Sequence, residues 1–253
     1  MSRSKAELSI TKRILLDYIK FKTNNNHIFF AGNEYIAEAQ LSSDAKATAM
    51  VKSVGKRLSE ATERYLKANG FESELANLQW EFNLVKNNEV NAFCMPGGKI
   101  VVYEGLLSVA QTEAELAAVV GHEIGHAVAK HSNERMSQQI MTQYGMAILS
   151  QALSQKSAAV QTVATSVFGL GAQVGLMLPY SRKHEYEADY MGIVFMEIAG
   201  YDSNSALEFW TKMAAGGGNT NDFLSTHPSD NKRIAQISKR IPEAQAIGKS
   251  MNQ

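Results

Sequence analysis

The chain has 253 residues, of which 45% are hydrophobic and 20% are charged, as in globular rather than disordered proteins. Its 25 basic and 25 acidic residues cancel, so there is no basic surplus of the kind that binds nucleic acid or anionic lipid. The single cysteine, Cys94, excludes an internal disulfide framework and a cysteine-based zinc site, and its apolar neighbours predict a buried, inert thiol.

The first 70 residues carry helical patterns and no chemical motif. Apolar spacing predicts a short helix over residues 8–22, and the charges spread along this stretch argue against a secretory signal peptide. Ser42, Ser43 and Asp44 are N-cap candidates for a long helix that ends at Asn69 and Gly70. We expect residues 1–70 to form an N-terminal helical scaffold, in a chain that is either cytoplasmic or has lost an export signal.

Period-two alternation follows and predicts a small sheet. Trp80, Phe82 and Leu84 alternate with polar residues, as in a strand. Turns rich in asparagine and glycine separate this strand from two further strands, 90–95 and 99–103. Three short strands joined by such turns predict an antiparallel meander.

A helix start signal comes next along the chain. Thr112 and Glu115 match the T-x-x-E capping box, and apolar residues recur at helical spacing as far as Val128. A long, well-capped helix is therefore expected to begin after Thr112.

The third turn of this helix contains an H-E-x-x-H motif, formed by His122, Glu123 and His126. Residues four apart share one face of a helix, so both imidazoles can bind one metal ion. The glutamate stands one position away and can polarise a water on that metal. This arrangement is the zinc-peptidase signature, but a catalytic zinc site requires a third protein ligand.

Two candidates for the third ligand are disfavoured by spacing. A metzincin would have glycine and histidine where this chain has Ala129 and Ser132, which excludes that class. His131 lies five residues after His126, about 140° round a helix, so we expect it to face elsewhere as a solvated or helix-terminal histidine.

A glutamate from a second helix is the remaining solution. Glu185 and Asp189 lie four apart, so Glu185 can complete the metal shell while Asp189 accepts the free ring N–H of His122. Glu187 is a rival ligand, but Met191 occupies its i+4 position and offers no such partner. We expect one zinc ion on the two motif histidines and Glu185.

No charged residue occurs between Lys156 and Arg182. The run raises the question of a membrane span, but its polar residues, its glycines and Pro179 lower the apolarity below that of a confident span. We expect buried or cleft-lining helices here, with membrane contact as the alternative, and hypothesise that the segment is a lid or plug over the cleft.

Three ordered segments carry a family resemblance: GHEIGHAVAKH from Gly121, SRKHEYEAD from Ser181 and STHPSDNKR from Ser225. They resemble the gluzincin zinc metallopeptidases of the family that contains HtpX, the mitochondrial Oma-type protease and the CAAX prenyl endoprotease (metallopeptidase family 48), most closely its soluble bacterial periplasmic and lipoprotein members. The resemblance implies an α+β, mostly helical, compact gluzincin fold. A small antiparallel sheet would pack on the H-E-x-x-H helix.

The sequence shows no repeats and no interdomain linker, which predicts a single peptidase domain over residues 1–253. The resemblance covers its catalytic core at 79–241. It implies a zinc endopeptidase in which Glu123 is the general base, acting on unfolded or misfolded polypeptides in the periplasm or cell envelope. The oligomeric state stays open, and a cytoplasmic location is the alternative to the envelope.

Two site residues and a substrate strand come from the resemblance alone. His227 matches a histidine near the zinc, either an extra ligand that blocks water or a donor to the reaction oxyanion. Arg233 matches an arginine that supports the oxyanion or the metal shell. Strand 91–93 resembles the edge strand to which an extended substrate adds.

Two other classes compete with the peptidase. The first is a chaperone-like binding module for envelope proteins, with a latent or plugged zinc site. Alternatively, the zinc is purely structural, in which case four ligands would close the site and Glu123 would have no role.

Overall fold

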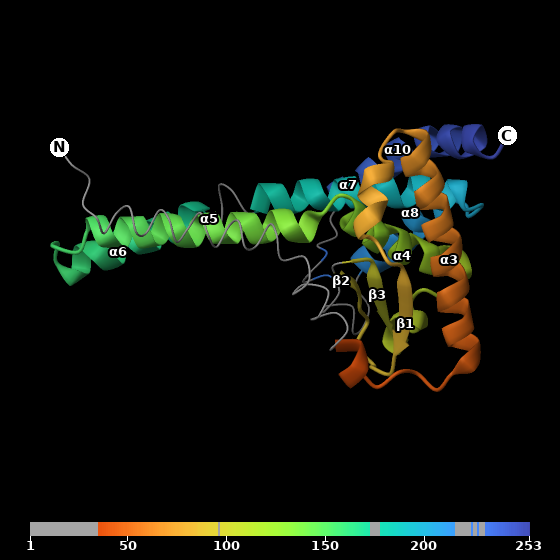
Figure 1. Cartoon of the computed structure of the whole chain (residues 1–253), viewed down its shortest axis with the longest axis horizontal. Helices are drawn as coiled ribbons and strands as arrows, with labels where there is room; N and C mark the ends of the chain where they lie inside the picture. The colour runs from red at the N-terminus through yellow and green to blue at the C-terminus, as the bar shows by residue number, and fades with distance from the viewer. Residues whose placement is uncertain (1–34, 96, 173–177, 216–223, 225–226, 228–230) are drawn as a thin grey trace. The chain divides into compact units, whose positions relative to one another are not determined.

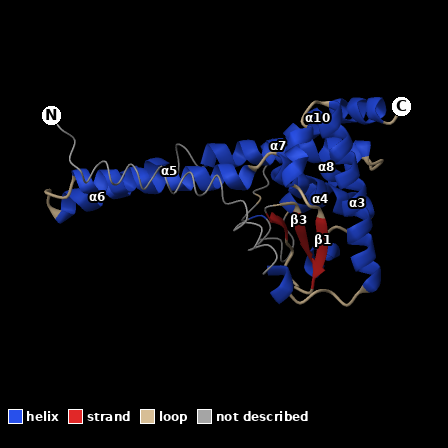
Figure 2. Ribbon diagram, in the orientation of Figure 1, coloured by secondary structure: helices blue, strands red, loops and turns tan. Residues whose placement is uncertain are grey.

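The structure, a computed structural model, describes residues 35–95, 97–172, 178–215, 224, 227 and 231–253. The chain divides into two compact units, Met1–Gln40 and Leu41–Gln253, and the helix expected over residues 8–22 lies outside the described residues. The second unit is mostly helical with one small sheet (Figure 1). Figure 2 shows the helices in blue and the strands in red. This confirms the α+β, mostly helical class.

Helix α3, Ala45–Ala68, begins and ends as expected from the sequence. The Asp44 side chain accepts a hydrogen bond from the amide of Ala47 at 2.9 Å, and Gly70 follows the helix with a φ of 79°. The apolar face of α3 packs on the sheet and on the central helix of the fold. Its buried residues include Val51, Val54, Leu58 and Ala61.

The sheet has three strands: β1, Glu81–Val85; β2, Ala92–Met95; and β3, Lys99–Tyr103. Their order is β1-β3-β2, with β3 antiparallel to β2 but parallel to β1. The sheet is therefore mixed, and the expected antiparallel meander was wrong for the pairing of β1. The connection after β1 is too long for a tight hairpin, whereas the turn at Gly97, with a φ of 90°, folds β3 back between β2 and β1.

Helix α4, Glu113–Val128, crosses the centre of this unit. Its capping box is complete, because the Thr112 hydroxyl accepts from the amide of Glu115 and the Glu115 carboxylate accepts from the amide of Thr112. Most of α4 is buried because α3, α7 and α8 pack around it and the sheet contacts it as well.

Helices α7, α8 and α10 form the rest of the helical packing around α4. Helix α7 spans Leu178–Ile198 and packs along α4 (Figure 1). Helices α8, Asn204–Ala214, and α10, Asn231–Met251, pack on each other and contact α4 and α7 respectively. The core is thus built round the helix that carries H-E-x-x-H.

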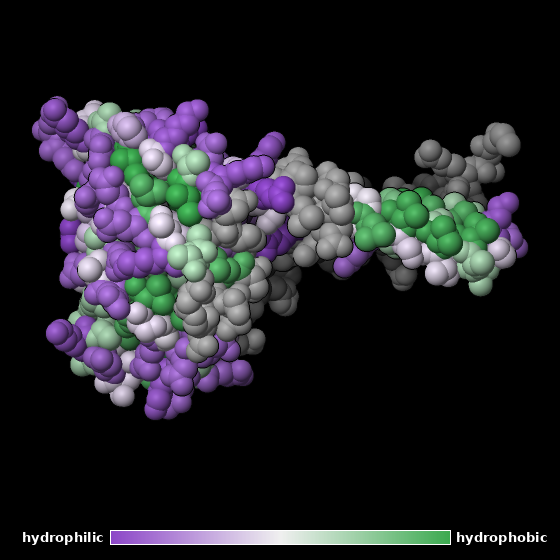
Figure 3. All heavy atoms as spheres, turned by 180° about the vertical axis from the view of Figure 1, so that it is seen from behind, coloured by the Kyte–Doolittle hydropathy of each residue, from purple (hydrophilic) through white to green (hydrophobic). Residues whose placement is uncertain are grey.

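Helices α5, His131–Ala152, and α6, Ala158–Ala172, form a hairpin that extends away from α4 (Figure 1). The expectation of buried or cleft-lining helices was wrong for α6, which has no buried residue. Its Val163, Val167 and Leu170 are 62% to 64% exposed, and Figure 3 shows apolar residues gathered on the hairpin. The reason is that α6 packs mainly on α5 in the described chain, so most of its apolar face is left uncovered.

Among the helices of the described residues, none is both long enough and apolar enough to cross a bilayer.

Candidate metal centre

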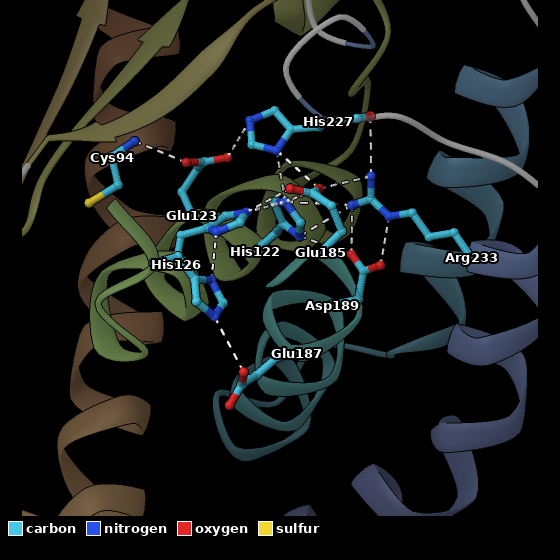
Figure 4. A network of polar contacts seen from close by, with 10 residues as sticks. Cys94, His122, Glu123, His126, Glu185, Glu187, Asp189, His227 and Arg233 are labelled. Atoms are coloured by element: carbon cyan, nitrogen blue, oxygen red, sulfur yellow. Dashed lines mark hydrogen bonds and ion pairs between the residues drawn. The ribbon is translucent and has the colours of Figure 1, made fainter. Parts of the chain in front are cut away.

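Four potential metal ligands come together beside α4 (Figure 4). His122 and His126 project from α4, Glu185 from α7, and His227 from the segment before α10. One ligand atom of each lies within 4.8 Å of those of the other three. The structure therefore brings together the three ligands expected from spacing and adds the histidine that the resemblance singled out.

The distances between the ligand atoms fit a zinc ion. His122 Nε2 lies 3.0 Å from His126 Nε2 and 3.3 Å from Glu185 Oε2, and His126 Nε2 lies 3.4 Å from Glu185 Oε1. Ligand atoms around a tetrahedral zinc, with bonds of about 2.0–2.1 Å, stand about 3.3 Å apart. Glu185 Oε1 is also buried without a hydrogen-bond partner, as expected of an oxygen that binds a cation.

Glu123 lies between the ligand group and the edge of the sheet. Its Oε2 accepts a hydrogen bond from the amide of Cys94 on β2 at 2.9 Å, and its Oε1 lies 3.5 Å from His227 Nε2. The carboxylate is buried, and Oε1 has no hydrogen-bond partner. One oxygen is thus held by the backbone, while the other lies on the side of His227. Cys94 is only partly buried, which differs from the predicted buried thiol, but desolvation raises the pKa of its thiol, in keeping with an inert cysteine.

Asp189 lies behind His122, where the sequence spacing placed it. Its Oδ1 is 2.9 Å from His122 Nδ1. Arg233 donates to both oxygens of Asp189, from Nε at 2.6 Å and from Nη2 at 2.7 Å, and its Nη1 lies 3.2 Å from Glu185 Oε2. The guanidinium is only 1% exposed and stacks 3.6 Å above the ring of Trp210. Arg233 therefore contacts two carboxylates of α7, those of Glu185 and Asp189.

Burial and pairing together set the charges of these groups. Burial opposes ionisation of Asp189, but the Arg233 guanidinium lowers the pKa of that carboxyl below its usual range. Burial also opposes ionisation of Glu185, yet hydrogen bonds with the neighbouring histidines lower its pKa strongly. For His122, burial disfavours the charged ring, but the hydrogen bond with Asp189 raises its pKa to about 9. Both carboxylates are therefore anionic and suited to a cation.

His131 is not among the four potential ligands, as predicted, but the expectation that it faces elsewhere as a solvated histidine was wrong. Its ring is 4% exposed, and its Nδ1 lies 2.8 Å from His126 Nδ1. Helix α4 ends at Val128, and Lys130 takes a left-handed conformation with a φ of 57°, so the angle expected for one continuous helix does not apply. His131 is helix-terminal, as the first residue of α5, but it is not solvated. Burial lowers the pKa of His131 to about 3, so its ring is neutral.

Two more residues lie behind His131. Glu187, the rival ligand, points out of the metal group, with Oε2 3.3 Å from His131 Nε2 and a side chain 59% exposed. His184 stacks on His131, with ring centroids 4.1 Å apart, and its Nε2 lies 2.9 Å from Glu134 Oε2. Sequence reasoning missed His184, although its i, i+3 spacing to Glu187 placed both on one face of α7.

The chain is similar to known metallopeptidases over most of its length. Residues 52–241 match the model of Peptidase family M48. The chain is 37% identical over 183 residues to mitochondrial metalloendopeptidase OMA1 of Schizosaccharomyces pombe, covering 68% of this chain and 50% of that protein. It is 39% identical over 186 residues to mitochondrial metalloendopeptidase OMA1 of Arabidopsis thaliana, covering 73% and 36%.

A bacterial relative is also similar. The beta-barrel assembly-enhancing protease of Escherichia coli is 29% identical over 171 residues, which cover 64% of this chain and 34% of that protein. The chain thus spans half or less of the length of these relatives. The family model covers most of the chain, including all three motifs, and confirms the resemblance drawn from them: the chain belongs to peptidase family M48.

Proposed function

We propose that the chain is a zinc-dependent endopeptidase that hydrolyses peptide bonds of unfolded or misfolded polypeptides. The observation that carries this proposal is the group of His122, His126 and Glu185 with the carboxylate of Glu123 beside it. Relatives named metalloendopeptidase and protease support it. A purely structural zinc would not need a buried carboxylate with an unpaired oxygen next to its ligands.

Each residue of the site has a role in this mechanism. His122, His126 and Glu185 hold the zinc, which when bound supplies a Lewis acid that lowers the pKa of a water toward about 7. Glu123 takes the proton of the attacking water at Oε1 and delivers it to the leaving amine, while the amide of Cys94 keeps the carboxylate in place at Oε2. Because the ligand imidazoles must be neutral, zinc affinity should fall in acid.

Arg233 acts through the carboxylates in this proposal. Its contacts include both oxygens of Asp189, Glu185 Oε2, the carbonyl of His227 and, from Nη2 at 3.3 Å, His122 Nδ1. A guanidinium engaged in this way supports the metal shell, because it fixes the carboxylates that hold or orient the ligands. Direct donation to the oxyanion is not part of the proposed role.

Strand β2 offers a surface for the substrate main chain. The sheet order leaves β2 at an edge, paired to β3 on one side, and the amide of Cys94 on this strand contacts Glu123. An extended polypeptide that adds to this edge would lie beside the general base. Recognition through the main chain favours unfolded substrates, because a folded protein seldom presents an unpaired extended segment.

His227 is proposed to be a fourth ligand that keeps the site latent. Its Nδ1 lies 3.1 Å from His122 Nε2 and 3.2 Å from Glu185 Oε2, and its Nε2 lies 3.5 Å from Glu123 Oε1. The ring thus fills the space between the ligands and the general base, where the attacking water belongs. His227 must leave this position before hydrolysis can begin.

The same position of His227 supports a second candidate function, a chaperone-like module that binds envelope proteins and keeps its zinc site closed. A polypeptide is the partner in both candidates. We also propose a location in the periplasm or cell envelope, supported by the name of the bacterial relative as a beta-barrel assembly-enhancing protease. Fractionation of cells that express the full-length protein tests this location, and recovery in the cytoplasm would contradict it.

The test of the peptidase combines metal analysis with digestion of an unfolded protein. Wild type, Glu123→Gln, His227→Ala and the double variant are compared, with the exposed Glu208→Gln as a matched control for loss of one carboxylate. We expect one zinc per chain throughout and cleavage only where Glu123 is present. Zinc binding with equal, negligible cleavage in all five proteins would reject the peptidase and favour the binding module.

A further inference from the structure

Both ligand histidines of α4 are held at the ring nitrogen that faces away from the metal group. His122 Nδ1 lies 2.9 Å from Asp189 Oδ1, and His126 Nδ1 lies 2.8 Å from His131 Nδ1. The Nε2 atoms of the two ligands are 3.0 Å apart and point into the group. The contact of His122 with Asp189 follows from the helix spacing of α7. The contact of His126 with His131 has no role in the proposed mechanism.

The contact between His126 and His131 constrains where the protons lie. A histidine that binds metal through Nε2 carries its ring proton at Nδ1, so His126 must donate and His131 Nδ1 must accept. The proton of a neutral His131 then lies at Nε2, which faces Glu187 Oε2 at 3.3 Å. A carboxylate only accepts hydrogen bonds when ionised, so Glu187 selects this tautomer of His131.

We propose that His131 and Glu187 form a positioning pair that holds His126 in its metal-binding tautomer, as Asp189 does for His122. This inference rests on the proposed zinc site. The orientation of the His131 ring is fixed, because the residue is buried and its ring stacks on that of His184 with only 19° between the ring planes. The left-handed turn at Lys130 brings His131 back toward His126.

The two supports differ in where their negative charge lies. Asp189 is buried and contacts its histidine directly, whereas Glu187 is mostly exposed and acts through the intervening ring of His131. Solvent weakens an exposed hydrogen bond to a carboxylate. Loss of His131 should therefore harm zinc binding more than loss of the Glu187 charge.

The decisive comparison is between His131→Leu and His131→Asn in the full chain. Leucine fills a similar space without an acceptor, whereas the asparagine Oδ1 can take the place of the histidine Nδ1. Zinc affinity is measured by competition with a chromogenic chelator. We expect His131→Leu to raise the Kd by about 10- to 100-fold and His131→Asn to restore most of that loss. Equal losses in both variants, or no loss in the leucine variant, would overturn the proposal.

His184→Phe is the matched control, because it keeps a ring stacked on His131 while removing a histidine that lies outside the ligand contacts. Its zinc Kd should stay at the wild-type value, and a loss equal to that of His131→Leu would show that packing alone is at work. If His131→Leu does not fold, Glu187→Gln is the alternative variant, because Glu187 is at an exposed position. It should raise the zinc Kd by a smaller factor than the loss of His131 does. An unchanged Kd in Glu187→Gln would remove Glu187 from the pair.

A second readout does not need zinc. Nitrogen-15 NMR of histidine-labelled, metal-free protein shows which ring nitrogen of His126 carries the proton. We expect Nδ1 in wild type and a mixture of tautomers in Glu187→Gln, and identical spectra would overturn the proposal. Wild type that binds no zinc would refute the proposed function instead, while these spectra would still decide the role of the pair.

Discussion

Gly121 on α4 and Gly192 on α7 lie against each other with no side chain between them. A Cβ atom on Gly121 would lie 3.1 Å from the carbonyl oxygen of Gly192, and one on Gly192 would lie 2.9 Å from the backbone nitrogen of His122. One turn further along α4, a Cβ on Gly125 would lie 2.8 Å from the carbonyl oxygen of Ala188. Because these glycines have no side chain, the backbones of the two helices can come into direct contact. This contact brings the ligand histidines of α4 close to Glu185 and Asp189 of α7.

Replacement of Gly125 with alanine should weaken zinc binding and destabilise the fold. The new methyl group would meet backbone atoms of Ala188, which cannot turn aside as a side chain can, so α7 must move away from α4. Overpacking of this kind costs about 1–3 kcal/mol. The shift would also separate Glu185 from His126. Urea denaturation measures the free energy of unfolding, and chelator competition measures the Kd for zinc.

Gly171→Ala is the matched control for this prediction. An added Cβ at Gly171, on α6, would meet no heavy atom within 4 Å. Alanine is favoured over glycine within a helix by about 0.5–1 kcal/mol, so this variant should be slightly more stable and bind zinc as wild type does. The same loss in both glycine variants would contradict the role of the close helix contact.

Arg233→Met should destabilise the metal-free chain by about 3–5 kcal/mol, because removal of one partner leaves buried carboxylates without a counter-charge. Bound zinc should offset part of this loss by neutralising Glu185. The free energy of unfolding is measured by urea titration with and without zinc. Arg240→Met is the control, because Arg240 pairs with Glu243 on the surface, where such pairs contribute about 0–1 kcal/mol. Equal costs at the two positions would refute this account of Arg233.

His227→Ala should increase cleavage of an unfolded protein while weakening zinc binding, because it opens the position of the attacking water and removes one ligand. The rate of cleavage and the Kd for zinc are measured on the same preparations. If His227 is instead a donor to the oxyanion, its loss should lower kcat by about 10²- to 10³-fold. The direction of the rate change therefore separates the two roles that the sequence left open.

The capping box should make stability depend on pH. Burial opposes ionisation of Glu115, but the hydrogen bond from Lys212 and the amides of Gln111 and Thr112 lower its pKa overall. A carboxyl group whose pKa is lower in the folded chain stabilises the fold above its unfolded pKa, about 4.3, and loses that contribution as the pH falls through the folded value. The stability advantage of wild type over Glu115→Gln should therefore shrink below about pH 4.3.

Urea titrations at several pH values measure this difference. The exposed Glu208→Gln is the control, and its difference from wild type should stay nearly constant over the same range. A pH-independent gap between wild type and Glu115→Gln would show that the carboxylate contributes through packing and not through its charge.

The residues of the proposed metal site could be identified from the sequence because their spacing follows local helix geometry. His122 and His126 are four apart, as are Glu185 and Asp189, and this period holds wherever a helix forms. The capping box likewise depends only on contacts within one turn. The positions of His227 and Arg233 needed the family resemblance, since nothing within their own segment ties them to a metal.

Contacts between distant segments were decided only by the tertiary structure. The place of β3 between β2 and β1, the uncovered face of α6 and the contact of His131 with His126 all depend on where the chain reverses direction. The turn at Lys130 shows the reason: one residue in a left-handed conformation ends α4 and redirects every side chain after it. A periodic sequence pattern predicts a helix and which residues share each of its faces. Which element packs against each face depends on such turns and on packing across the fold.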